Sequence, residues 1–513
     1  MSSMRRPMHP VTTIDNRLLE LEPVPTLLAR IAAERSAQFM AGRPIRVSRA
    51  PGRLDVMGGI ADYTGSLVCE LPIDRAAAIA IQPRDDRQIN LFSFNLADQG
   101  LPSSFQISLD VLASQPVDSL RREFEAPANK WAAYLAGCLV ILHERQWINL
   151  NHPQVSGQTV ALFSTIPMGA GLASSAAIEV AMMMALRDHF NLTHPASGRS
   201  LRVIDSAGGP SSVFGPMELA QLCQEVENRI VGAPCGIMDQ AASCLGETGK
   251  LMRMICQPHQ LEAPLSAPSG LRFVGIDSNV KRSAAAIAYR HTRCAAFMGH
   301  KIILEKMRQM GQAAGRRLVA DPMRGYLANL DPDDYKRLFR ATLPESMSGL
   351  DFIDQFGQTI DPSTVIQPDV QYSIQHALDH HVLEARRVRK FAEFIEQACA
   401  TEERHRKGSA LDRAGHLMYA SHQSYSMDAM LGAPETDLLV NLARKRERAG
   451  IYGARVTGRG CGGTVAILCD QSPSADAAIA QILSEYRDQT NRAPTLINGS
   501  SPGAWHLGTT AVP

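Results

Sequence analysis

The chain has 513 residues, of which 45% are hydrophobic and 20% are charged, and its formal net charge at pH 7 is +1. This composition is typical of a folded globular protein, and the length exceeds that of one ordinary core, so two or three domains are expected. A net charge near zero gives no electrostatic support for nucleic acid or an anionic membrane as the main partner.

The N-terminal segment, the apolar runs and the cysteines indicate the cellular compartment of the protein. The first ten residues contain two arginines without an apolar segment behind them, so no secretory signal is expected. Apolar runs such as residues 176–186 are too short to span a bilayer. Ten cysteines occur without CxxC pairs or histidines at metal-binding spacing, which indicates reduced and mostly buried thiols. We therefore expect a cytoplasmic protein.

The first half of the chain alternates strand-like and helical segments. An N-terminal extension, residues 1–40, contains one predicted helix at about 26–39. Three β-branched or aromatic runs then predict strands at residues 79–82, 89–94 and 159–163. The polar stretch 196–215, which contains Gly, Ser and Pro, predicts a surface loop. Residues 41–257 are accordingly expected to form an N-terminal α+β domain.

A proline-rich stretch at residues 257–270 marks a candidate domain boundary. The remaining elements are a predicted strand, a mainly helical region and two more strands, at residues 271–277, 284–450, 452–456 and 464–469. Residues 258–513 thus form the second expected domain. The fold class predicted is α+β, with two domains side by side.

A glycine-rich turn follows the strand expected at 159–163. It spans residues 167–177, here called the phosphate loop, and its Gly169 and Gly171 allow a ligand to approach the backbone closely. A helix is expected to begin near Ser174, where free N–H groups and the positive end of the helix dipole favour a di- or triphosphate. From this segment alone, a tight turn with Ser174 as a simple helix cap is an equally good interpretation.

Two other glycine-rich segments are less informative. Residues 246–250 resemble the end of a Walker A loop, but Cys244 stands where that loop needs its first glycine, so a turn is predicted. Residues 458–463 fit the pattern GxGxxG, yet the segment after them is strand-like. A dinucleotide fingerprint requires a helix there, which argues against a nicotinamide enzyme.

Three separate segments together resemble the GHMP small-molecule kinases, the superfamily of galactokinase, homoserine kinase and mevalonate kinase. Residues 50–63 resemble the galactokinase signature, the phosphate loop resembles the second motif, and residues 456–463 resemble the C-terminal glycine motif. Residues 222–240 are also similar to galactokinase. The resemblance implies a two-domain GHMP kinase fold with the active site in the cleft between the domains. It also implies an Mg-ATP-dependent kinase of a small molecule.

The resemblance implies catalytic roles for two residues. Asp239 matches the catalytic aspartate, which would accept or orient the proton of the attacking sugar hydroxyl. Arg53 matches the catalytic arginine, whose charge would keep Asp239 ionised and stabilise the transferring phosphoryl group. The alternative is that these two residues form a plain structural ion pair.

The same resemblance implies how Mg-ATP is held. The residues expected to contact the nucleotide are Gly169, Gly171, Leu172, Ser174, Ser175, Ala176 and Trp131, the last of which matches a tryptophan that stacks on adenine. Ser174, Ser175 and Glu227 would hold Mg²⁺, since they are the few hard oxygen ligands that this ion prefers. Glu227 lies at the edge of an apolar helical stripe, and as an alternative it is a solvated helix residue.

The sugar is indicated by a departure from galactokinase. Where that family has Glu-His-Thr-Asp-Tyr, with Glu-His contacting the exocyclic hydroxymethyl group, this chain has Gly59-Ile60-Ala61-Asp62-Tyr63. Asp62, the ring-hydroxyl contact, is kept. L-Arabinose has the ring stereochemistry of D-galactose without the hydroxymethyl group, and the segment looks like the L-arabinokinases of plants. Gly236 and Tyr289 match further sugar contacts, although Tyr289 could also be a plain helix-face residue.

The function expected is therefore phosphorylation of the anomeric hydroxyl of L-arabinose by ATP. The alternatives are a galactokinase, or a kinase of another galacto-configured sugar, and a non-catalytic galactokinase-like sensor of sugar and ATP. Arg459 replaces a residue that is usually small in the C-terminal glycine motif, and it either reaches a phosphate or points to solvent. The oligomeric state is left open.

Overall fold

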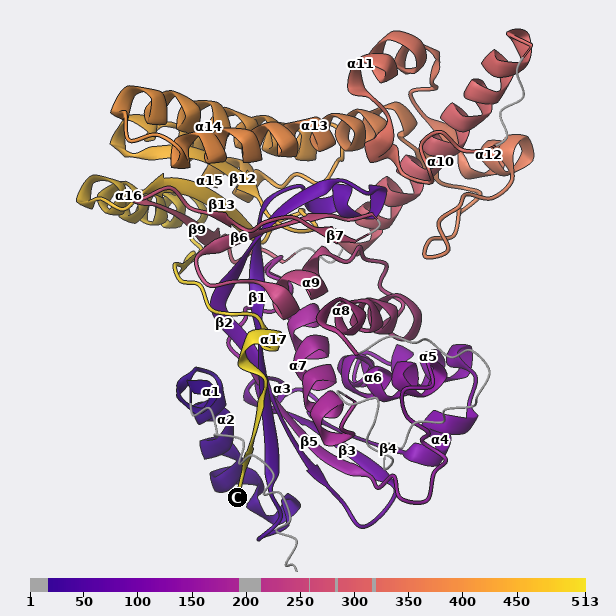
Figure 1. Ribbon diagram of the computed structural model, residues 1–513, viewed down its shortest axis with the longest axis vertical. Helices are drawn as coiled ribbons and strands as arrows, with labels where there is room; N and C mark the ends of the chain where they lie inside the picture. Colours follow the sequence, from indigo (N-terminus) through magenta and orange to yellow (C-terminus); the bar gives the residue numbers. More distant parts are fainter. Residues whose placement is uncertain (1–16, 193–213, 258, 282–284, 316–319) are drawn as a thin grey trace, which may run out of the picture.

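The computed structural model describes residues 17–192, 214–257, 259–281, 285–315 and 320–513. Most of the surface loop predicted at 196–215 lies outside these residues. Figure 1 shows two parts stacked along the long axis, a lower part built on a long curved sheet and an upper part dominated by long helices. The phosphate loop begins the helix α7 (Ser174–His189), which lies inside the lower part beside the sheet.

The first sheet is mixed, and its strand order within the described residues is β15-β1-β2-β5-β3-β4. Strand β6 pairs with the far end of β2 and carries the short strands β7 and β8. The bounds are β1 (Ile45–Met57), β2 (Leu67–Pro83), β3 (Gln88–Ser93), β4 (Ser104–Ser108), β5 (Gln158–Ser164), β6 (Lys250–Ile255), β7 (Gln260–Leu261), β8 (Leu265–Ser266) and β15 (Thr509–Val512). The strands predicted at 79–82, 89–94 and 159–163 are confirmed.

Helices cover both faces of this sheet, which explains why its long strands are buried on both sides. On one face lie α4 (Leu109–Ser114), α5 (Val117–Glu125), α6 (Ala133–Glu144), α7, α8 (Pro216–Glu225) and α9 (Met238–Leu245). The other face carries the short helices α1 (Arg17–Glu20) and α2 (Val24–Arg30), whose Leu18, Val24 and Leu27 pack on the sheet. The short α3 (Phe94–Asp98) follows β3 directly.

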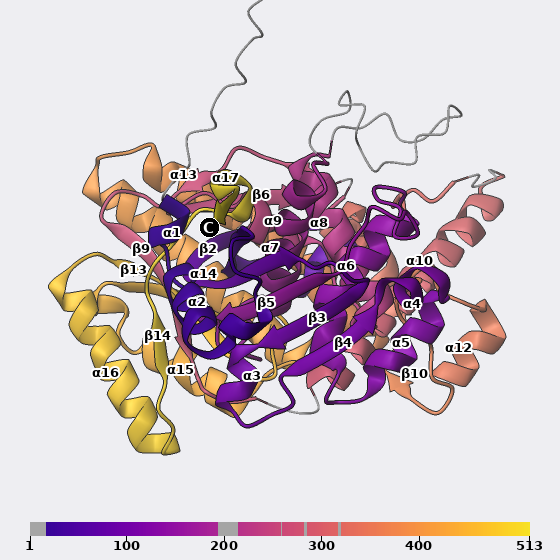
Figure 2. The same cartoon turned by 90° about the horizontal axis from the view of Figure 1, so that it is seen from below.

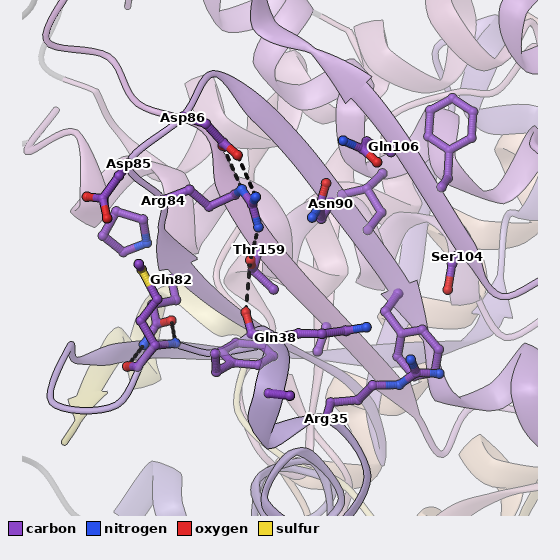
Figure 3. A pocket seen from close by; sticks show the side chains of 18 residues that line it. Arg35, Gln38, Gln82, Arg84, Asp85, Asp86, Asn90, Ser104, Gln106 and Thr159 are labelled. Carbon is purple, nitrogen blue, oxygen red and sulfur yellow. Dashed lines mark hydrogen bonds and ion pairs between the residues drawn. The ribbon is translucent and has the colours of Figure 1, made fainter.

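The helix predicted at 26–39 is only partly confirmed. After α2 the chain continues as a π turn, Ile31–Arg35, and a 3₁₀ turn, Ser36–Gln38. These turns and the sheet enclose an open groove of about 770 Å³, shown in Figure 3. Gln82 donates to the Met40 carbonyl at 3.0 Å and thereby anchors the extension to β2.

The upper part has its own sheet, ordered β12-β13-β9-β14. Its strands are β9 (Leu271–Asp277), β12 (Ile451–Val456), β13 (Thr464–Asp470) and β14 (Thr495–Ile497). The longer helices are α10 (Ala285–Ala313), α13 (Ile374–Cys399), α14 (Arg404–Met427), α15 (Pro434–Arg444) and α16 (Pro473–Thr490). Smaller elements are α11 (Pro332–Asp334), α12 (Gly349–Phe356), β10 (Met347–Ser348) and β11 (Gln371–Tyr372). The helical region predicted at 284–450 and its flanking strands are confirmed.

The chain crosses between the two parts more often than the expected domain bounds imply. Strand β15 pairs antiparallel with β1, so the end of the expected 258–513 domain joins the first sheet. Helix α17 (Ala504–Leu507) packs on α9 and α7 of the lower part. The expected boundary at 257–270 contains β7 and β8, which extend the sheet through β6. Without β7 and β8, one edge of β6 would have no strand partner. The sequence pattern does not predict these two-residue strands.

The prediction of mostly buried cysteines is confirmed, because nine of the ten are buried and Cys399 is exposed. Among the described helices, none combines the length and the apolar character that crossing a membrane requires.

Candidate active site

The phosphate loop has the conformation that a helix-based anion site needs. Gly169 and Gly171 have φ values of 73° and 74°, in the left-handed region that glycine tolerates best. Ala173 is also left-handed and stands as the residue before the first turn of α7, so Ser174 is a helical residue and not the cap. Helix α7 is 16 residues long and begins at Ser174, so the free N–H groups of its first turn face the phosphate loop, as the sequence predicts.

The C-terminal glycine motif, residues 456–463, packs directly on the phosphate loop. Thr464 donates to the Ala170 carbonyl through both its backbone N–H, at 3.0 Å, and its hydroxyl, at 2.8 Å. A Cβ atom on Gly463 would lie 2.6 Å from that carbonyl oxygen, and one on Gly458 would lie 2.8 Å from the Gly171 carbonyl oxygen. The glycines therefore allow the upper part to hold the loop by close backbone approach.

Asp239 and Arg53 meet at the floor of a pocket beside the loop. Arg53 donates to Asp239 Oδ1 through Nη2 at 2.7 Å and through Nε at 3.0 Å, and its Nη1 donates to the Gly171 carbonyl at 2.6 Å. Burial works against the charge of Arg53, but Asp239, Glu70 and Asp55 raise its pKa above the usual value, so the guanidinium stays charged. Asp239 is the more accessible partner, with a side chain 15% exposed against 2% for Arg53.

This pocket has a volume of about 450 Å³ and lies between the two parts of the chain. It brings together most of the residues assigned to the nucleotide and to catalysis, namely Arg53, Trp131, Gly169, Gly171, Leu172, Ser174, Ser175 and Asp239. Ala176 is fully buried behind Ser175 in α7 and does not line the pocket. The indole N–H of Trp131 has no hydrogen-bond partner within the described residues.

Glu227 lies in a π turn, Val226–Val231, and is 1% exposed, so it is not a solvated helix residue. Its Oε1 accepts from the Ser175 hydroxyl at 3.1 Å and from Arg459 Nη2 at 3.1 Å, and its Oε2 accepts from Gln240 at 3.0 Å. Burial raises the pKa of Glu227, while the charge of Arg459 opposes that rise. Arg459 therefore does not point freely to solvent; its visible partner is this carboxylate.

The donors for a divalent cation are few and are all oxygens. Ser174, Ser175 and Glu227 fit the chemistry of Mg²⁺ bound mainly through phosphates. Within the described residues, no group of three or more His, Cys, Asp or Glu side chains is placed to hold a metal by itself. Glu179, fully buried on α7, leaves Oε1 without a hydrogen-bond partner and accepts from Gln240 through Oε2 at 3.2 Å.

A second pocket of about 430 Å³ is lined by Asp62 and is here called the Asp62 pocket. Asp62 and Gly236 both line it, and a Cβ atom on Gly236 would lie 1.7 Å from Asp62 Oδ2. Burial, together with the nearby charge of Asp239, raises the pKa of Asp62 to about 7. Tyr289, on α10, is buried, and its ring meets that of Tyr63 edge-on at 5.9 Å.

Gly59 and Ile60 line neither of these two pockets. Both are buried in a 3₁₀ turn, Gly59–Thr64, and Gly59 has a left-handed φ of 49°. The space that a side chain at position 59 would fill is taken by Tyr425 of α14. The Tyr425 hydroxyl accepts from the Ile60 N–H at 2.8 Å and donates to the Gly458 carbonyl at 3.0 Å.

Other residues of the site carry no signal in the sequence pattern. Arg293 of α10 pairs with Asp361 through two contacts of 2.9 Å, and its guanidinium lies 4.8 Å from the Tyr63 ring centre. Arg455 and Asp55, both fully buried, pair at 2.9 Å behind the glycine motif. These pairs join segments 68 and 400 residues apart, so no local spacing could have indicated them.

Comparisons with known proteins agree with this geometry. Residues 37–83 match the galactokinase galactose-binding signature, residues 134–247 the GHMP kinases N terminal domain, and residues 395–488 the GHMP kinases C terminal domain. An L-arabinokinase of Arabidopsis thaliana is 34% identical over 90% of this chain. This chain spans about half of that relative, 46% of its length. A galactokinase of Chloroflexus aggregans is 27% identical, with 88% of this chain and 90% of that protein covered.

A solved structure shows the same fold. The crystal structure of Lactococcus lactis galactokinase complexed with galactose superposes with a TM-score of 0.66 at 22% identity, covering 94% of this chain and 99% of that one. The expected two-domain α+β architecture is thereby confirmed.

Proposed function

Because this chain belongs to the GHMP kinase family, we propose that it transfers the γ-phosphoryl group of ATP to the anomeric hydroxyl of L-arabinose, yielding L-arabinose 1-phosphate and ADP. The observation that carries the proposal is the Asp239–Arg53 pair at 2.7 Å, which lines one pocket together with the phosphate loop. The chemistry needs a base at that point, and a fixed positive charge beside it.

The chain's own groups divide the work of phosphoryl transfer. Asp239 accepts the proton of the anomeric hydroxyl while that oxygen bonds to the γ-phosphorus and the bond to the bridging oxygen of ADP breaks. Arg53 holds Asp239 in position beside a fixed positive charge, since its other contacts, to Glu70 at 3.1 Å and to the Gly171 carbonyl, fix the guanidinium. The N–H groups at the start of α7 bind the phosphates.

The nucleotide and the metal ion each have a proposed place. Trp131 would stack on the adenine, at the end of the pocket lined also by Ser93 and Asn95. Ser174, Ser175 and Glu227 would hold Mg²⁺. When bound, Mg²⁺ supplies positive charge that offsets the charge of the phosphates during transfer.

The proposal that the sugar is L-arabinose rests on the packing of Tyr425 against Gly59. Tyr425 occupies that space, and its hydroxyl already accepts one hydrogen bond and donates another, so it offers little to a hydroxymethyl group. Ile60 is apolar and 2% exposed, and like Gly59 it lines neither pocket. Positions 59 and 60 therefore offer no polar partner to a hydroxymethyl group, whose hydroxyl would go unpaired there, whereas a pentose has no such group. The 34% identity to an L-arabinokinase supports the same choice.

Galactose is the second candidate, since residues 37–83 match the galactokinase signature and Asp62 is kept. An assay coupled to ADP release, run with Mg-ATP across a panel of monosaccharides, separates the possibilities. We expect kcat/KM to be highest for L-arabinose. Faster turnover of galactose would overturn the choice of sugar, and tight binding of sugar without ADP release would instead indicate a non-catalytic sensor.

A further inference from the structure

Arg459 occupies an unusual place in the nucleotide pocket. It belongs to the C-terminal glycine motif, at a position where the family resemblance leads one to expect a small residue, and it lines the pocket beside the phosphate loop. Its Nη2 donates to Glu227 Oε1 at 3.1 Å, and its guanidinium carbon lies 5.2 Å from the Tyr289 ring centre. The Arg459 side chain therefore contacts both Glu227, the proposed metal ligand, and Tyr289, a proposed sugar contact.

Arg459 differs from Arg53 in how firmly it is held. Arg53 is 2% exposed and contacts two carboxylates and a backbone carbonyl. The Arg459 side chain is 38% exposed although its partner Glu227 is 1% exposed, so part of this side chain is open to the pocket that it lines. A guanidinium keeps its charge throughout the physiological pH range, so Arg459 is a cation.

Arg459 compensates the negative charge of Glu227 in the nucleotide-free protein. A carboxylate as buried as Glu227, which is 1% exposed, is costly to leave without a cation. A phosphate chain beside Ser174 and Ser175 would bring negative charge to the same guanidinium, because these serines line the same pocket and Ser175 shares the Glu227 oxygen with Arg459.

We propose that Arg459 is a further phosphate-binding residue of this site. It neutralises Glu227 in the nucleotide-free protein and contacts the terminal phosphates once ATP binds, leaving Glu227 available to the divalent cation. Charge stays balanced in both states, since Glu227 exchanges one cation for another. Arg459 lies against Tyr289, so its charge acts on the sugar-facing side of the phosphates, where negative charge must be offset during transfer. This inference rests on the proposed function.

The test measures nucleotide binding without turnover. Isothermal titration of the full chain with Mg-ATP in the absence of sugar, and separately with AMP, is compared between wild type, Arg459→Ala and Arg459→Lys. Loss of one charge-assisted contact predicts that Arg459→Ala raises the Kd for ATP about 10- to 100-fold, with the Kd for AMP changed less than about twofold. Arg459→Lys keeps a point charge and should fall between. Arg406→Ala removes a 75%-exposed arginine of α14 and serves as the control.

Turnover provides a second, independent reading. With Mg-ATP and L-arabinose, Arg459→Ala should lower kcat about 100-fold while KM for the sugar changes little. An unchanged Kd for ATP, or an equal loss of ATP and AMP affinity, would overturn the inference. If Arg459→Ala fails to fold, the intermediate Kd of Arg459→Lys decides the question. Failure of wild type to bind ATP, or to release ADP, would instead refute the proposed function.

Discussion

Gly59 and Tyr425 compete for one space, since a Cβ atom on Gly59 would lie 1.8 Å from the Tyr425 hydroxyl oxygen. The two residues are 366 positions apart (425 minus 59), and the neighbouring Ile60 N–H donates to the same hydroxyl at 2.8 Å. The absence of a side chain at position 59 and the presence of a tyrosine on α14 are therefore one feature of the site. Any change at one position has to be judged with the other.

The stability of the fold should show this coupling directly. Gly59→Ala is expected to cost about 1–3 kcal/mol from overpacking, with a further penalty for the left-handed φ of 49°. In a Tyr425→Phe background the atom at 1.8 Å is gone, so the same substitution should cost measurably less. Urea unfolding of the four proteins of this cycle gives the coupling. Equal costs in both backgrounds would show that the two side chains do not compete.

The sugar preference should change only when both sides of this contact change. Gly59→Glu with Ile60→His restores the galactokinase pair but places a side chain against Tyr425, so we expect a destabilised protein with poor turnover. Adding Tyr425→Ala vacates the space, and the ratio of kcat/KM for galactose to that for L-arabinose should then rise about tenfold or more. Tyr425→Ala alone is the control. No rise in the triple variant, measured on folded protein, would remove the basis for choosing L-arabinose.

Asp239→Asn should abolish most turnover but not binding. The amide cannot accept the hydroxyl proton, so kcat is expected to fall by about 10²- to 10⁴-fold. Since Asn keeps the shape of Asp and Arg53 remains held by Glu70 at 3.1 Å, the Kd values for ATP and sugar, measured by calorimetry, should change only a few-fold. Glu403→Gln, at a side chain 56% exposed, is the matched control. Nearly normal turnover in Asp239→Asn would mean that the pair is purely structural.

Asp62 should make stability depend on pH in a defined direction. Burial, the first cause, and Asp239 raise its pKa to about 7, against 3.8 for the unperturbed carboxyl. A raised carboxyl pKa means that stability is fullest at low pH and is lost as pH rises through about 7, because the folded protein must then ionise a buried group. Asp62→Asn removes this cost. The melting temperature of Asp62→Asn relative to wild type should therefore be higher at pH 8 than at pH 5.

A melting-temperature difference between Asp62→Asn and wild type that is the same at both pH values would show that Asp62 titrates normally. Ligand-free protein should be used, since a sugar bound at Asp62 would alter the titration.

Trp131 should report the nucleotide. It lines the pocket, whereas Trp147 is buried in the core and Trp505 lies under Arg187, 4.5 Å from its guanidinium. Adenine stacked on Trp131 should quench its fluorescence, and Trp131→Ala should raise the Kd for ATP about tenfold, as expected for loss of one base–aromatic stack. Trp505→Phe should leave both signals unchanged. Quenching that persists in Trp131→Ala would place the adenine elsewhere.

The sequence predicted the parts of this site that lie within single segments. The phosphate loop was visible because strand, glycines and helix follow one another between residues 158 and 189, and local rules apply to such a run. Arg53 and Asp239 were found through the family resemblance, since 186 residues separate them. Physical reasoning alone would not have paired them.

The sequence does not predict which side chains pack around the phosphate loop and the Arg53–Asp239 pair. Tyr425, and the Arg293–Asp361 and Arg455–Asp55 pairs, depend on how distant helices and strands pack, which no local period encodes. The same holds for Arg459, whose partner Glu227 is 232 residues away. The pairing of β15 with β1 leaves no signal for a related reason, since a four-residue strand gives almost no pattern before its partner is known.

The pairing of β15 with β1 has a consequence for how the chain is made. The contact between Arg46 and Thr509 spans 463 residues, so ribosomal synthesis leaves this edge of β1 uncovered for most of the time that the chain is growing. At about 5–20 residues per second, that interval is on the order of half a minute or more. The lower part can collapse early, but its sheet closes only after the upper part has been synthesised. An uncovered strand edge can pair with other chains, so we expect this edge of β1 to be exposed to aggregation during that time.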